Sequence, residues 1–284
     1  MPVPKVLPIV LLSLAGLMAP ARGGAGAGTL PSGAPPALVS AALSNELHAA
    51  QDTSHPMRYL LRKQTPRLTS TREICETKDG AVARLLSINE SPLDAVAQQK
   101  EIARLEELAG DPAWQRHRKQ AEAADRSRAL EVLRLLPTAF LYEDIGPGED
   151  ASGAIERFRF RPNPRFSPPD LEAQVLTAIA GEIWINPAQQ RVTRLQGHLQ
   201  QSVKFGWGIL GRLYKGGQIR IDQEEVAPGV WRTIQLQMQM SGRVLFRTRN
   251  FDVLQQESRF SPLPANLTYQ EAIGLLLEKE QALR

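Results

Sequence analysis

Apolar and polar residues alternate most regularly in the last third of the chain. Between Val230 and Met240, one parity is apolar except at Arg232, and the other is polar except at Trp231. A period of two is typical of a β-strand with one buried face and one wet face. The same alternation predicts strands over residues 181–185, 191–205, 218–226, 230–240 and 243–253. No helical crossover separates these segments, so we expect an antiparallel meander.

Turn residues mark where the strands should end. Ser241-Gly242 is interpreted as the turn between the last two strands of the meander. Asp79-Gly80 predicts a hairpin in an earlier strand region at residues 57–88. A third group of strands is expected at residues 138–161, with a Gly/Pro/Asp turn at 146–153.

Helical periodicity appears in three places. An apolar stripe predicts a helix over residues 37–51, and a T-x-x-E capping box at Thr268 starts a short helix near the end of the chain. Residues 92–136 form a charged helical excursion, whose second helix is expected to begin at Asp111-Pro112 and stop at Pro137. The fold class predicted is α+β: a curved antiparallel sheet, half-open and barrel-like, covered by helices.

The first 21 residues have the features of a cleavable signal peptide. Lys5 precedes an apolar run from Leu7 to Met18, and Ala19-Pro20-Ala21 offers a cleavage site. The run is shorter than the roughly 20 residues of a membrane-spanning helix. The sole cysteine is Cys75, so no lipidation cysteine follows the run. We therefore predict a periplasmic or secreted protein, with a flexible linker at 22–36 and one domain at 37–284.

Composition narrows the classes of partner. The formal net charge is +4, and removing residues 1–21 takes away one lysine and leaves +3. This small excess, together with export, argues against a nucleic-acid partner, although peripheral attraction to an anionic membrane surface stays open. A single cysteine cannot form an internal disulfide, so the fold must rest on core burial. The oligomeric state is not predicted.

No motif for catalysis or cofactor binding fits its surroundings. Gly206–Gly211 matches G-x-G-x-x-G, but the residues that follow predict another strand, whereas a dinucleotide site needs a helix there. The four histidines lack metal-ligand spacing, and no G-x-S-x-G is present. We predict no catalytic residue, no metal and no cofactor.

The apolar side of the meander is the candidate ligand-binding surface. A sheet with one apolar face must cover it, either with a complete core or with a cover that admits a guest. Methionine suits a surface that repacks around different guests. The candidate cavity residues are Leu195, Leu199, Val203, Phe205, Trp207, Ile219, Ile221, Ile234, Leu236, Met238 and Met240. The alternative is that they form ordinary core against the helices.

One hairpin resembles a known superfamily. Gly181-Glu182-Ile183-Trp184-Ile185-Asn186-Pro187, followed by Arg191–Leu195, is similar to a hairpin of the LolA/LolB/RseB-like proteins, which are periplasmic lipoprotein carriers and sensors. The resemblance implies a half-open antiparallel barrel closed by helices, with a cavity for acyl chains. Asn186 stands where these proteins usually have Asp, and no ligand-gating arginine can be matched, so no site residue is transferred.

Three hypotheses about function follow. The first is a non-enzymatic envelope protein that binds a lipid, an acyl chain or a lipidated partner in an apolar cavity. The second is a structural or sensory envelope protein with a filled core that acts through its surface. The third is an exported hydrolase, which would need a carboxylate or Ser–His cluster that sequence spacing hides. The lining of the space beneath residues 191–255 distinguishes them.

Overall fold

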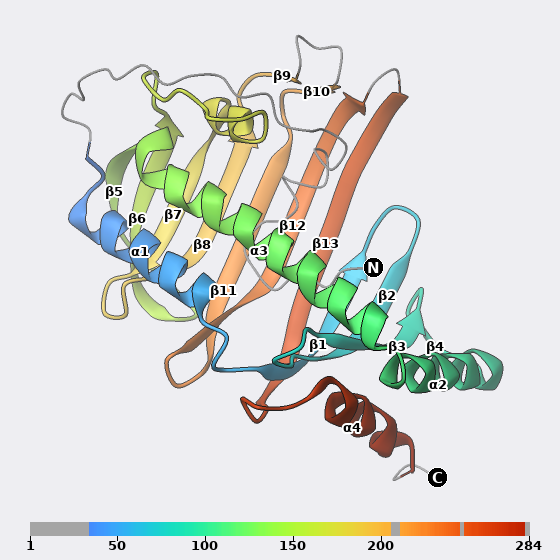
Figure 1. Cartoon of the computed structure of the whole chain (residues 1–284). Coiled ribbons are helices and arrows are strands. Elements are labelled where there is room, and N and C mark those ends of the chain that lie inside the picture. The colour runs from blue at the N-terminus through green and yellow to red at the C-terminus, as the bar shows by residue number, and fades with distance from the viewer. Residues whose placement is uncertain (1–33, 206–210, 245–246, 282–284) are drawn as a thin grey trace.

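The chain folds around one open antiparallel sheet. The computed structural model describes residues 34–205, 211–244 and 247–281, so the expected signal peptide lies outside the described residues (Figure 1). Thirteen strands form the sheet in the order β4-β3-β2-β1-β13-β12-β11-β8-β7-β6-β5, with β9 and β10 added beside β12. The two ends of this order do not pair with each other, so the sheet is not closed into a barrel. The predicted α+β class with a helix-covered antiparallel sheet is confirmed.

The elements have the following bounds. The strands are β1 (Met57–Gln64), β2 (Thr69–Cys75), β3 (Val82–Ile88), β4 (Ser91–Pro92), β5 (Phe140–Asp150), β6 (Gly153–Pro162), β7 (Ile179–Asn186), β8 (Arg191–Leu199), β9 (Val203–Phe205), β10 (Gly211–Leu213), β11 (Gln218–Ala227), β12 (Val230–Val244) and β13 (Arg247–Pro262). The helices are α1 (Ala37–Gln51), α2 (Ala95–Ala109), α3 (Pro112–Ala139), the 3-10 helix η2 (Ala173–Thr177) and α4 (Tyr269–Gln281).

One turn prediction in the meander is wrong. Ser241 and Gly242 lie inside β12 and pair with Asn250 and Arg249 of β13. Gly242 is needed there because a Cβ atom would lie 2.6 Å from the carbonyl oxygen of Arg212 on β10. The glycine therefore permits close packing of strands rather than a turn.

The expected strand over residues 191–205 is broken in two. It ends at Leu199, whose N–H donates to the carbonyl of Gly217 at 2.8 Å and whose carbonyl accepts from Gly216 at 2.9 Å. The chain resumes as β9 at Val203. The strand therefore ends where Leu199 bonds the backbone of Gly216 and Gly217, and the alternation of apolar and polar residues gives no sign of this.

The hairpin of β5 and β6 is longer than predicted. The expected turn at 146–153 shortens to the tip between Asp150 and Gly153, so Pro147 lies within β5. Proline lacks a ladder donor, and it is tolerated here because β5 is an edge strand. Helix α3 also ends later than predicted, at Ala139, since Pro137 lies inside the helix.

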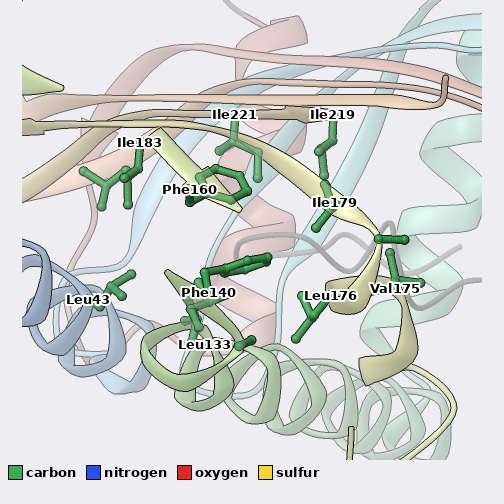
Figure 2. Close-up of a cluster of buried hydrophobic side chains, with 14 of the residues drawn as sticks. Leu43, Leu133, Phe140, Phe160, Val175, Leu176, Ile179, Ile183, Ile219 and Ile221 are labelled. Carbon is green, nitrogen blue, oxygen red and sulfur yellow. The ribbon is translucent and has the colours of Figure 1, made fainter. Parts of the chain in front are cut away.

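The main core fills the space between the sheet and three helical segments. Leu43 of α1, Leu133 of α3 and Leu176 of η2 lie on the helical side of this core, and Phe160 of β6 and Ile183 of β7 lie on the sheet side (Figure 2). All five side chains are at most 4% exposed. The helices thus cover the end of the sheet that consists of β5, β6, β7 and β8.

Side chains of α2 and α3 cap the part of the β3 edge that the two-residue strand β4 leaves unpaired. The Glu101 carboxylate accepts from the Leu85 N–H at 2.7 Å, and Arg104 donates to the Ala83 carbonyl at 2.8 Å. Glu122 of α3 accepts from the Ala81 N–H at 3.1 Å. Polar side chains thus form hydrogen bonds with the backbone groups to which another strand would otherwise pair.

Helix α3 connects the two ends of the sheet (Figure 1). Glu122 bonds the chain just before β3, and Ala139 leads directly into β5. At 1.5 Å per residue, the helix covers about 26 Å between these two points. The ten strands from β3 to β5 extend about 43 Å side by side at a spacing of about 4.8 Å. The sheet must therefore curve away from α3 between its ends.

Candidate functional site

The concave face of the sheet, defined as the side toward α1 and α3, holds most of the predicted cavity residues. Strand register places Phe158, Ile183, Leu195, Ile221 and Leu236 side by side across five strands on this face. Directly opposed residues of neighbouring strands share one face of a sheet. A continuous apolar band therefore runs from β6 to β12.

The structure places the eleven predicted residues as follows. Seven are buried in the main core: Leu199, Val203, Ile219, Ile221, Leu236, Met238 and Met240. Leu195 and Phe205 are partly buried and pack against that core, whereas Ile234 is half-buried and belongs to no buried cluster. Trp207 lies outside the described residues. Sharing a face and being buried do not decide between core and cavity, so the ligand-binding role stays a prediction.

The concave face becomes polar beyond β12. Leu236 lies opposite Gln255 of β13, which in turn lies opposite Lys63 of β1. One step along, Glu257 lies opposite Leu61, which lies opposite Arg72 of β2. Sequence reasoning missed these polar residues because their strands are distant in the chain and meet only through the sheet order.

The inward side of α3 changes character in the same direction. Its buried residues toward the C-terminus are Ala129, Leu133, Leu136 and Ala139. Toward the N-terminus they are Arg118 and Glu122, which form an ion pair at 2.9 Å. The helix is thus apolar where it meets the main core and charged where it approaches β2 and β3.

Two cations on the polar part of the concave face have altered acidity. Burial lowers the pKa of Lys63, and the nearby Arg72 lowers it further. Burial also lowers the pKa of Arg72, against an opposing attraction from Glu101, and Arg104 and Arg118 add to the lowering. No carboxylate in the described part of the chain forms an ion pair with Lys63 or Arg72. These charges are held in place by the fold rather than by salt bridges.

Glu257 is a carboxyl group with a strongly raised pKa. Burial and the neighbouring Glu76 carboxylate raise the pKa of Glu257 to about 8, against an opposing attraction from Arg232. The folded protein therefore holds a proton there that the unfolded chain releases above its ordinary pKa of 4.5. The resulting stabilisation is complete below that pH and is lost as the pH rises toward 8.

We expect Glu257→Gln to remove this pH dependence. At pH 8.5 the variant should be about 1 to 2 kcal/mol more stable than the native chain, and at pH 4.5 the two should match. Urea unfolding at both pH values measures the difference. A native chain whose stability does not fall between pH 5 and pH 8 relative to Glu257→Gln contradicts the expectation.

A cluster of serine, histidine and aspartate follows α1. The Ser54 hydroxyl donates to Asp52 at 2.6 Å, and Nδ1 of His55 lies 2.9 Å from that hydroxyl and 3.0 Å from Asp52. Nδ1 thus contacts both partners, whereas a catalytic triad uses one ring nitrogen for each. Hydrogen bonds from Ser54 lower the pKa of Asp52 to about 2, as in a tight local turn. The cluster lacks the geometry of a hydrolase site.

Gly211 is the residue of the glycine-rich motif that the structure describes. Residues 206–210 of the G-x-G-x-x-G string lie outside the described residues, and Gly211 opens the strand β10. Across the described ranges, no three His, Cys, Asp or Glu side chains gather as metal ligands would. No helix in those ranges has the length and apolar character needed to cross a bilayer.

The convex face of the sheet is polar, as the alternation predicts. A shallow groove of about 620 Å³ runs over β6, β7, β8, β11 and β12. Its polar lining comes from the positions that alternate with the apolar band, including Arg159, His198, Gln218 and Gln237.

Comparisons with known proteins give distant structural similarities. No family model matches the chain, and no curated protein matches it. A crystal structure of a domain named for outer membrane lipoprotein sorting, from Vibrio parahaemolyticus, is 8% identical with a TM-score of 0.31, and the match covers 83% of this chain and 97% of that one. A DUF1329 family protein from Desulfovibrio piger is 9% identical with a TM-score of 0.29, covering 84% and 98%. The first name is of the class that the hairpin resembles, and neither match assigns a function to this chain.

Proposed function

We propose that the protein is an exported, non-enzymatic envelope protein that binds an acyl chain or a lipidated partner on its concave face. The ligand would lie between α3 and the strands β12 and β13. The observation that carries this proposal is a mismatch between the two sides of that space. Apolar side chains of β12 face a helix whose inward residues change from Leu133 to the charged pair Arg118 and Glu122.

The residues of β12 suit a guest of variable shape. Met238 and Met240 are unbranched and neighbour each other along the concave face. Phe251 and Val253 of β13 lie directly opposite them and are only partly buried. Because the sheet curves away from α3 at these strands, an acyl chain could add apolar contacts that the helix does not make there.

Lipid content and probe binding test the proposal. We expect protein purified from its native envelope, expressed with its own leader, to release lipid into organic solvent. We also expect saturable binding of a fluorescent fatty acid, weakened at least tenfold by Met238→Gln. That substitution keeps the side-chain length and adds a polar amide within the apolar face.

Gln239→Met is the matched control. Residue 239 is the next residue of β12, is exposed and faces the convex side. The control should bind the probe as the native chain does, and circular dichroism should show both variants folded. Absence of extractable lipid together with absence of probe binding would rule out the proposal, as would equal binding by the native chain and folded Met238→Gln.

A second candidate is a structural or sensory envelope protein with a filled core. It is favoured by the burial of seven predicted cavity residues in one continuous cluster. This alternative predicts no probe binding, together with reproducible crosslinks from the folded chain to an envelope partner. Lipid release and saturable probe binding would count against it.

A further inference from the structure

A cavity separate from the β12 surface lies where α2, α3 and α4 meet β2 and β3. Its volume is about 300 Å³. Five elements contribute to its lining, which includes Arg72, Leu85, Arg104, Trp114, Arg118 and Tyr269. Three guanidinium groups and two aromatic rings thus converge on one small space, together with aliphatic side chains and the Glu101 carboxylate.

The charges around this cavity leave a positive excess. Arg104 is paired with Glu101 at 2.6 Å, and Arg118 is paired with Glu122 at 2.9 Å. Arg72 forms no ion pair with a described carboxylate; Glu101, which also lines the cavity, attracts its charge from a distance, and the other two arginines oppose it. Three cations and two carboxylates leave one positive charge, which is assigned to Arg72. A half-buried cation of this kind is stabilised by an anion that reaches it.

A buried hydroxyl adjoins the same cavity. Tyr269 is 0% exposed, and its hydroxyl has no hydrogen-bond partner among the described residues. Burial raises the pKa of Tyr269 to about 12, so the group is a neutral donor at physiological pH. Buried polar groups normally have a partner, which makes an unsatisfied donor beside a cationic cavity informative.

We propose that this cavity binds an oxyanion, a phosphate or carboxylate group, with Arg72 as the charge partner and Tyr269 as a hydrogen-bond donor. Arginine suits the role because its planar fork matches the geometry of such oxygens. Trp114 and Leu85 would contact an apolar portion attached to the anion. The inference does not depend on acyl-chain binding at β12, because none of the β12 residues lines this cavity.

Calorimetric titration of the purified chain tests the inference with three soluble probes. The probes are inorganic phosphate, dihexanoyl phosphatidic acid and uncharged dihexanoylglycerol. We expect both anions to bind saturably and the uncharged lipid not to bind at this site. Tighter binding of the phosphatidic acid would identify a lipid headgroup as the ligand, and equal or weaker binding would identify a free anion. Both results support the oxyanion site.

Three variants separate binding from folding. Arg72→Gln should weaken anion binding at least tenfold while leaving the melting temperature equal or higher, because it removes a half-buried charge that has no ion-pair partner among the described residues. Tyr269→Phe should weaken binding three- to tenfold and keep the ring that packs 6.1 Å from Trp114. Arg161→Gln, an exposed arginine on β6, should bind as the native chain does. Absence of saturable anion binding, or equal binding by folded Arg72→Gln, would overturn the inference.

Discussion

Replacing Glu46 with alanine is expected to lower the free energy of unfolding by about 3 to 5 kcal/mol. The Glu46 side chain projects from α1 and is 6% exposed. Its carboxylate accepts from Arg191 at 2.9 and 3.2 Å, from the Val192 N–H at 3.1 Å and from the Gln223 amide at 3.1 Å. One carboxylate thus ties α1 to β8 and β11.

Glu46→Ala lowers the stability because it leaves the groups that bonded Glu46 without their partner. Arg191 would keep a largely buried charge, and the ring of Trp231, 5.6 Å away, would be its remaining favourable neighbour among the described residues. The Val192 N–H would also lose its carboxylate acceptor. Because this bond holds α1 over the main core, its loss would loosen the helix that covers β7 and β8.

Urea unfolding of Glu46→Ala and of Glu143→Ala measures the effect against a matched control. Glu143 pairs with Arg159 at 3.5 Å on the surface, where both side chains are more than half exposed. An exposed pair of this kind contributes well under about 1 kcal/mol. Equal losses in the two variants would show that the Glu46 network does not hold α1 in place.

Gly181→Ala is expected to destabilise the fold by about 3 kcal/mol. A Cβ atom at position 181 would lie 1.9 Å from the carbonyl oxygen of Gln196 and 2.6 Å from the Cα atom of Gly197. These are backbone atoms of the paired strand β8, so no side-chain rotation can relieve the overlap. Strands β7 and β8 would have to move apart at this position, in the middle of the sheet.

Gly274→Ala supplies a control of opposite sign. Gly274 lies in α4, and a Cβ atom there would meet nothing within 4 Å. Alanine is favoured over glycine in a helix interior by about 0.5 to 1 kcal/mol, so this variant should be more stable than the native chain. Thermal melts of both variants test the pair. A Gly181→Ala chain as stable as the native one would contradict the close strand approach.

Local patterns predicted much of the fold. The helix at 37–51, the hairpin at Asp79-Gly80 and the Thr268–Glu271 capping box follow from short stretches of sequence, and the structure contains all three. The break between β8 and β9 and the passage of β12 through Gly242 could not be predicted in this way. The first depends on a hydrogen bond to Gly217 in the loop before β11, and the second on the close approach of β10 at Arg212.

The residues of the candidate sites also fall into those that local sequence predicts and those that depend on strand pairing. The apolar band could be predicted from alternation, because each strand that contributes to it shows its buried face in its own sequence. The polar residues Lys63, Arg72 and Glu257 join that face only through pairing of β1 with β2 and β13. Glu46 did leave a signal in the sequence, since an acid occupies the helix face of Val39, Ala42 and Leu43.

The capped edge of β3 has a consequence for assembly. An open sheet can recruit strands from other molecules and grow into a polymer, a hazard that closed barrels avoid. Glu101 and Arg104 of α2 occupy the groups at which such growth would start, and Pro147 lies on the strand at the opposite edge. A chain that lost Glu101 could stay folded and still form oligomers through β3. Loss of these side chains would then appear first as oligomer formation, before the melting temperature changes.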